Sequence, residues 1–101
     1  MAEIIFINCF EVAPGREPAF FALWTEMDGY LRTKPGFRWR RLHHALDADA
    51  RLSYVNVAGW DTAAQFAAAH DEVFDRLVAD PGWQEFNPQP ALYTVDREDI
   101  A

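Results

Sequence analysis

The sequence is poor in cysteine, lysine and long apolar runs, and each shortage argues against a class of protein. Cys9 is the single cysteine, so it cannot form a disulfide within the chain, and Lys34 is the single lysine. A formal charge of −7 at pH 7 leaves little basic surface for phosphate contacts, so we expect no nucleic-acid partner. No apolar run approaches the ~20 residues of a membrane span, and the N-terminus lacks the features of a secretory leader. We therefore expect a cytoplasmic protein with no membrane partner.

The sequence is rich in residues that build a core. Half of its 101 residues are hydrophobic and 15% are aromatic, which is typical of a folded domain rather than a disordered chain. No repeat, low-complexity tract or linker interrupts it. A chain of this length buries roughly 60–70% of its unfolded surface. We therefore predict a single domain over residues 1–101.

The spacing of apolar residues predicts four strands and two helices in the order βαββαβ. Alternating or β-branched runs indicate strands at 3–12, 37–46, 51–60 and 91–97. Apolar residues at helical spacing indicate a helix from Pro18 to the KPG at 34–36, and a second from a cap at Asp61 or Thr62 to the DPG at 80–82, interrupted near His70–Asp71. This order predicts a ferredoxin-like α+β fold, an antiparallel sheet with both helices on one face.

The other face of that sheet is also expected to be apolar. The run IIFI at 4–7 is hydrophobic on both faces of its strand, whereas a sheet with one wet face should alternate. Soluble monomers seldom expose an apolar patch of this kind. We therefore predict a homodimer in which the sheets of two copies pack against each other.

The strand YVNVAGW, residues 54–60, places polar groups on one of its faces. Asn56 and Trp60 lie on the same face because strand residues alternate, and valines occupy the opposite face. Asn8 is a second amide inside an apolar strand, and burying an unpaired amide costs about 1–3 kcal/mol. Each of the three can be a packing residue, or it can line a pocket between sheet and helices.

Histidines offer further candidates, and metal sites do not. His43 and His44 are adjacent on a strand and face opposite ways, so at most one can enter the pocket, and they cannot chelate one metal together. His70 lies on the second helix, where it can be a solvated residue or a pocket residue. The arginines of RWRR, 38–41, can meet an anionic small molecule or form salt bridges. No metal-binding motif is present, and Cys9 in an apolar strand is expected to be inert.

These residues resemble the antibiotic biosynthesis monooxygenase family. The resemblance rests on the βαββαβ order, FEVAPGRE after the first strand, KPGF before the second, LHHALD, and NVAGW before the second helix. It extends from about residue 4 to residue 95 and implies a dimeric α+β barrel. One branch of the family oxidises phenolic or anthrone substrates with O2 and uses no metal, flavin or haem. The resemblance therefore implies a small aromatic substrate, O2 as co-substrate and no cofactor.

Roles for individual residues also follow from the resemblance. Asn56 and Trp60 match the strand-three Asn and Trp of the quinone-forming branch, and His43 best matches its strand-two His. These three are the implied catalytic residues. A Tyr of that branch is replaced by Phe66, and an Arg falls near Phe74. The expected substrate contacts are Asn8, Trp24, Phe66, His70 and Phe74.

Three alternatives to the oxygenase interpretation remain. The same hydrogen-bond donors suit a cofactor-free cyclase or isomerase, because they stabilise any enolate. The haem-degrading branch also carries a strand-one Asn, which matches Asn8, but its helix-two Trp and His fall near Ala69 and Val78. A binding or dimerisation module with a filled core would need no chemistry at all.

Overall fold

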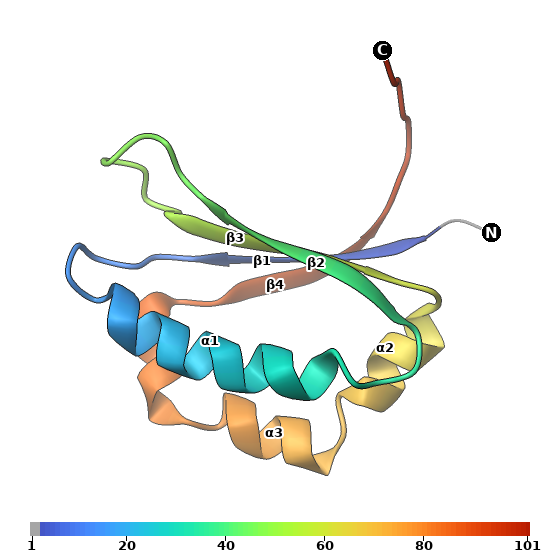
Figure 1. Cartoon of the computed structure of the whole chain (residues 1–101), viewed down its shortest axis with the longest axis horizontal. Helices are drawn as coiled ribbons and strands as arrows, with labels where there is room; N and C mark the ends of the chain where they lie inside the picture. Colours follow the sequence, from blue (N-terminus) through green and yellow to red (C-terminus); the bar gives the residue numbers. More distant parts are fainter. Residues whose placement is uncertain (1–2) are drawn as a thin grey trace.

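The computed structural model describes residues 3–101, which form one antiparallel sheet with all helices on one side of it (Figure 1). The strands lie in the order β2-β3-β1-β4, and each pairs antiparallel with its neighbour. The predicted ferredoxin-like α+β fold is confirmed. The strands are β1 (Ile4–Phe10), β2 (Phe37–His44), β3 (Tyr54–Trp60) and β4 (Gln89–Thr94), and the helices are α1 (Glu17–Leu31), α2 (Ala63–Ala69), α3 (Glu72–Val78) and the 3-10 helix η1 (Pro81–Phe86).

Local sequence signals explain where the helices begin and end. Proline in the first turn of α1 has no N–H to leave unpaired. After α1, Gly36 adopts a φ of +91°, which L side chains avoid, and a Cβ there would lie 2.5 Å from the Gln65 side chain. Of the two caps that the sequence offers, Asp61 and Thr62, it is Thr62 that caps α2, by accepting the N–H of Gln65 at 3.1 Å.

The predicted interruption near His70–Asp71 divides the second helical segment into α2 and α3. His70 ends α2, and Asp71 begins α3 by accepting the N–H of Phe74 at 3.0 Å. The helix therefore restarts in a new direction with its own N-cap. In Figure 1, α3 lies beyond α1 as seen from the sheet, and it packs mainly against α1.

The segment before β4 is more ordered than the sequence indicates. The sequence pattern assigns no helix or strand to residues 83–90, but Pro81–Phe86 form η1, with Asp80 accepting the N–H of Gly82 at 2.8 Å. The short 3-10 turn buries Trp83 and Phe86 against α1 and the sheet. None of the helices formed by residues 3–101 combines the length and the hydropathy of a membrane-spanning segment.

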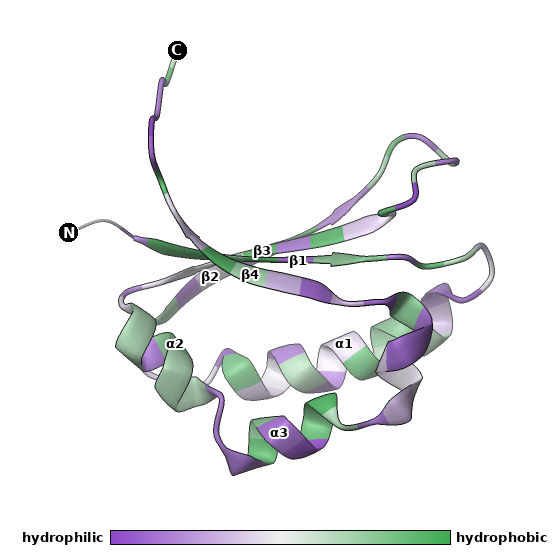
Figure 2. Ribbon diagram, turned by 180° about the vertical axis from the view of Figure 1, so that it is seen from behind, coloured by the Kyte–Doolittle hydropathy of each residue, from purple (hydrophilic) through white to green (hydrophobic). Residues whose placement is uncertain are grey.

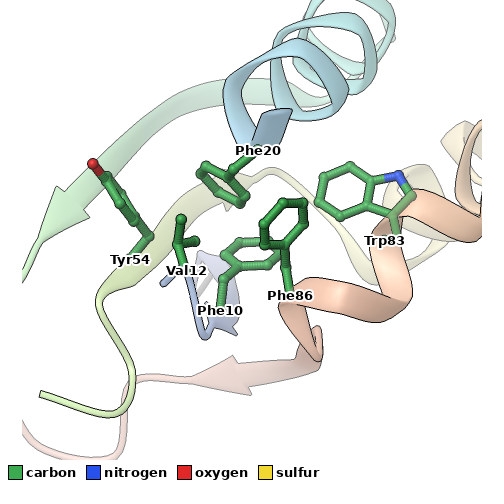
Figure 3. Close-up of a cluster of buried hydrophobic side chains, with 6 residues drawn as sticks. All are labelled: Phe10, Val12, Phe20, Tyr54, Trp83 and Phe86. Carbon is green, nitrogen blue, oxygen red and sulfur yellow. The ribbon is translucent and has the colours of Figure 1, made fainter. Parts of the chain in front are cut away.

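One end of the space between sheet and helices is filled by aromatic side chains. Phe20 of α1 is fully buried, and its ring centroid lies 4.9 Å from Phe10 and 5.4 Å from Phe86. Rings at such distances and tilted angles pack favourably. Figure 3 shows this cluster, which we call the aromatic core: Phe10, Val12, Phe20, Tyr54, Trp83 and Phe86.

None of the helices formed by the described residues lies on the opposite face of the sheet (Figure 1). Asn8 pairs with Asn56 across β1 and β3, so these two point toward the helices, and their neighbours Ile7 and Val57 point away. The hydropathy colouring marks β1 as apolar toward its N-terminal end (Figure 2). We call this uncovered surface the open face; it carries Ile5, Ile7, Val55, Val57 and Tyr93.

Candidate active site

A cavity of about 680 Å³ lies between the sheet and the helices, next to the aromatic core. This volume falls within the range of small-molecule sites, about 300–1,000 Å³. The cavity exists because α3 packs against α1 rather than on the sheet, and because Ala69 and Ala58 leave space where α2 meets β3. Most of its lining is apolar. The residues proposed from the sequence that line it are Asn8, Trp24, Asn56, Trp60, Phe66, His70 and Phe74.

Asn56 carries an unpaired polar atom in this apolar surrounding. Its side-chain oxygen Oδ1 is buried and has no hydrogen-bond partner among residues 3–101. A buried acceptor without a partner costs about 1–3 kcal/mol, so its presence calls for a reason. The cavity supplies one, because a ligand bound there can donate a hydrogen bond to this oxygen.

Trp60 and Phe66 form the wall beside Asn56. Trp60 is only 1% exposed, and its ring meets those of Phe37 and Phe66 edge-to-face, with centroids 5.5 Å apart in both pairs. These contacts fix the plane of the indole. Phe66 in turn contacts Phe6 of β1, with centroids 5.0 Å apart. The wall therefore offers a flat ligand aromatic faces and edges in fixed positions.

Asn8 faces the cavity beside Asn56 but has a structural partner. Its Oδ1 accepts the backbone N–H of Gln89 at 2.9 Å. Pro90 lies opposite Asn8 in the β1–β4 ladder and has no N–H to donate. The Asn8 side chain thus replaces a ladder hydrogen bond at the start of the edge strand β4.

His70 enters the cavity from the junction of α2 and α3. Its ring is held between Phe66 and Phe74, with centroid distances of 3.9 and 4.1 Å. Its Nδ1 lies 2.6 Å from the carbonyl oxygen of Phe66. The ring is therefore fixed by two aromatic contacts and one hydrogen bond.

A polar cluster next to His70 fastens this junction to α1. The Tyr30 hydroxyl donates to Asp71 Oδ2, and Lys34 lies 3.4 Å from the same oxygen and 4.1 Å from the centre of the Tyr30 ring. The hydrogen bond from Tyr30, with further ones from the Phe74 N–H and Lys34, lowers the pKa of Asp71 to about 2. We call Tyr30, Lys34 and Asp71 the junction cluster.

Arg40 and Asp28 form an ion pair in the cavity wall that sequence reasoning did not place there. Arg40 donates to the two Asp28 oxygens at 2.8 and 3.1 Å and lies 4.7 Å above the Trp24 ring. The hydrogen bonds to Asp28 raise the pKa of Arg40. Helical spacing could have identified Asp28, since it follows Trp24 by four residues and precedes Leu31 by three, and all three line the cavity.

The other arginines of RWRR lie outside the cavity. Arg38 donates a hydrogen bond to Asp61, and the guanidinium of Arg41 lies over the Trp39 ring.

The histidines of β2 lie outside the cavity. His43 pairs with Val55 on the open face, where its Nδ1 lies 3.1 Å from the Val55 carbonyl oxygen. The place in the pocket that the resemblance implies for His43 as a catalytic residue is therefore contradicted by the structure. His44 faces the helix side but stacks on Tyr54 at the far end of the strand, with ring centroids 4.5 Å apart. Neither lines the cavity, and His70 is the histidine that does.

A comparison with protein-family models decides the relationship. The model described as antibiotic biosynthesis monooxygenase matches residues 3–87. The chain belongs to this family. A search of curated proteins found no match.

Solved structures share the fold of this family member over nearly its whole length. A candidate monooxygenase from Shewanella loihica PV-4 is 27% identical with a TM-score of 0.81, covering 96% of this chain and 97% of the other. SnoaB, a cofactor-independent oxygenase from Streptomyces nogalater, is 22% identical with a TM-score of 0.76, covering 97% of each chain. Rv0793 from Mycobacterium tuberculosis is 18% identical with a TM-score of 0.71, covering 99% of each.

The donor set of this family member is suited to hydrogen bonding rather than to metal coordination. Across residues 3–101, no three His, Cys, Asp or Glu side chains come together as a metal site. Besides the indole N–H groups of its tryptophans, the polar side chains that line the cavity are the amides of Asn8, Asn56 and Gln84, the imidazole of His70 and the ion pair of Asp28 with Arg40. Such groups can bind hydroxyl and carbonyl oxygens and can move protons among them.

Proposed function

We propose that this protein is a cofactor-independent monooxygenase that oxidises a phenolic aromatic compound, of the anthrone type, with O2. The observation that carries the proposal is the unpaired Asn56 Oδ1 inside an aromatic-walled cavity. An apolar cavity of this size suits a flat polycyclic ligand, and the unpaired acceptor suits a ligand hydroxyl. Membership of the monooxygenase family supports the same reaction class.

The reaction balances without an added reductant. The methylene carbon of an anthrone loses two hydrogens and gains one oxygen atom, and the second atom of O2 leaves as water. The substrate supplies all four electrons that reduce O2. The protein therefore has to bind the substrate, favour its deprotonated form and stabilise negative charge on oxygen.

The residues around the cavity can supply these contributions. An amide N–H of Asn56 and the indole N–H of Trp60 are donors for a developing oxyanion. Trp24, Phe66 and Phe74 would contact the rings of the substrate. Exclusion of water by these aromatic walls would strengthen each hydrogen bond made inside.

Oxygen uptake with a dihydroxyanthracenone substrate tests the proposal. We expect O2 consumption equal to the quinone formed, without added metal, flavin or haem. Asn56→Ala and Trp60→Phe should each lower kcat about 10²–10³-fold, the usual cost of one oxyanion donor. His44→Gln, outside the cavity, should leave the rate unchanged. Turnover without O2 uptake would instead indicate a cyclase or isomerase, and a Soret band in a haem titration would indicate the haem-degrading branch.

We also propose that the functional unit is a homodimer formed through the open face. Ile5, Ile7, Val55 and Val57 present an apolar surface that no helix covers, and apolar patches of this kind commonly mark interfaces. Sedimentation should give the mass of two chains, and Val57→Glu should give that of one. A monomeric wild type would contradict the proposal. The cytoplasmic location stays a prediction.

A further inference from the structure

The imidazole of His70 is held in a single orientation by its neighbours. Phe66 and Phe74 pack against the ring in tilted contacts, with centroids 3.9 and 4.1 Å away, and Phe6 meets it edge-on at 6.5 Å. The ring forms part of the cavity lining. A side chain confined in this way presents the same atoms to any bound ligand.

The hydrogen bond to the backbone determines which nitrogen of His70 can accept a proton. Nδ1 lies 2.6 Å from the Phe66 carbonyl oxygen, and a carbonyl oxygen can only accept. The proton of the neutral imidazole therefore resides on Nδ1. Nε2 is left with its lone pair, and the aromatic neighbours offer it no donor.

We propose that His70 Nε2 is the proton acceptor for the substrate hydroxyl in this cavity. The inference rests on the proposed function and assigns a residue to its first step. The O–H bond of the phenol breaks and an Nε2–H bond forms. The electron pair of the O–H bond stays on the oxygen and gives the phenolate that O2 then oxidises. The imidazolium formed keeps its Nδ1–H bond to Phe66.

The carboxylates near His70 are poorer candidates for accepting the substrate proton than its imidazole. The other ionic groups of the cavity wall are Asp28 and Arg40, which pair with each other at 2.8 Å. Asp71, the next residue in the chain, is committed to Tyr30, Lys34 and the Phe74 N–H. Both carboxylates are thus already hydrogen-bonded, whereas Nε2 is a neutral acceptor that has no hydrogen-bond partner within residues 3–101.

Binding of 4-nitrophenol tests the assignment without requiring turnover, because its phenol and phenolate forms absorb at different wavelengths. In a buffer acidic enough to keep the free ligand neutral, the wild type should bind it with the phenolate spectrum. His70→Gln should bind it with the neutral phenol spectrum. His44→Gln, at a histidine outside both the cavity and the open face, is the matched control and should behave as the wild type. With the anthracenone substrate, His70→Gln should lower kcat about 10²–10⁴-fold with little change in KM.

Each outcome decides for or against His70. A phenolate spectrum that persists in His70→Gln, or a neutral spectrum in the wild type, would overturn the assignment, as would the absence of binding. His70→Asn provides a second variant if the first does not fold. A phenolate spectrum that depends on His70, together with no O2 uptake, would support the assignment and contradict the monooxygenase proposal alone.

Discussion

Two aromatic regions lie between the same sheet and the same helix layer, and they differ in what fills the space between their rings. In the aromatic core, side chains from β1, α1, β3 and η1 meet one another, and Phe20 is fully buried. In the cavity, Trp60, Phe66, His70 and Phe74 surround about 680 Å³ of space. Aromatic content alone therefore does not distinguish a core from a binding site.

The difference comes from the backbone that carries the aromatic residues. At the core end, η1 brings Trp83 and Phe86 directly onto Phe10 and Phe20. At the cavity end, the break after His70 turns α3 toward α1, so that nothing fills the layer above Asn56. The two ends also differ in polarity. The aromatic core carries only the hydroxyl of Tyr54 and the indole N–H of Trp83 as side-chain polar groups, whereas amides, an imidazole and an ion pair line the cavity.

Truncation of a ring should have its largest effect in the aromatic core. Phe20→Ala should lower the free energy of unfolding by about 3–5 kcal/mol, because it opens a cavity among close-packed rings. Phe74→Ala, at the cavity wall, should cost roughly half that or less, because it only enlarges an existing space. Urea unfolding of the two variants measures both values. Equal losses would show that the two regions are packed alike.

Replacing Asn56 should have a smaller effect on the free energy of unfolding than Phe20→Ala, and in the opposite direction. Asn56→Leu removes the unpaired buried oxygen and keeps the volume similar, so it should raise the free energy of unfolding by about 1–3 kcal/mol while abolishing most of the turnover. Asn8→Leu is the matched control, since Asn8 lies directly opposite in the ladder. It should lower the free energy of unfolding by about 0.5–1.5 kcal/mol, because the Gln89 N–H loses its acceptor.

The same urea experiment contains the outcome that would contradict this prediction. If Asn56→Leu is destabilising, the oxygen of Asn56 has a partner in solution and is not held for a ligand. If Asn8→Leu is neutral, the bond to Gln89 does not secure β4. A stabilised and inactive Asn56→Leu protein would show that the residue is kept for function at a cost in stability.

The fold could be predicted from the sequence because its signals are local. Helical spacing, strand alternation, a cap at Thr62 and the interruption at His70–Asp71 each depend on a few neighbouring residues. The structure agrees with the order of helices and strands, the cap and the interruption, whereas alternation is broken in β2. The turn η1 escaped prediction because Pro81 and Pro88 suggest a broken loop. Its burial depends on contacts with β1 and α1 that are distant in the sequence.

The assignment of His43 rested on the family resemblance, and the register of β2 shows why this residue lies on the other face of the sheet. β2 contains a bulge between Phe37 and Trp39. Phe37 pairs with Trp60 and Trp39 pairs with the adjacent Gly59, so β2 has one extra residue between these two pairs. Counting by alternation from Phe37 would place His43 on the helix side. The bulge reverses the alternation, so that Arg40 and His44 face the helices instead. The same reversal brings Arg40 into the cavity wall, which the sequence pattern does not indicate.

The smallest expected effect is a change in melting temperature at low pH, caused by protonation of Asp71 in the junction cluster at the cavity end. The folded pKa of Asp71 is about 2, below its ordinary value of 3.8. Its contribution to stability is therefore fully present above about pH 4 and is lost as the pH falls toward 2. Between pH 5 and pH 2, the melting temperature of Asp71→Asn should consequently fall less than that of the wild type. The difference should be small, because exposed pairs contribute little.

A matched variant at the core end sharpens this prediction. Glu85 has a pKa lowered by its hydrogen bonds with Arg16, and this pair joins η1 to the start of α1. Glu85→Gln should also reduce the acid dependence of the melting temperature, but binding of 4-nitrophenol should be unaffected because the pair lies away from the cavity. Asp71→Asn should weaken that binding, since the junction cluster positions His70. Equal binding by the two variants would mean that the aromatic contacts of Phe66 and Phe74 hold His70 in place without the junction cluster.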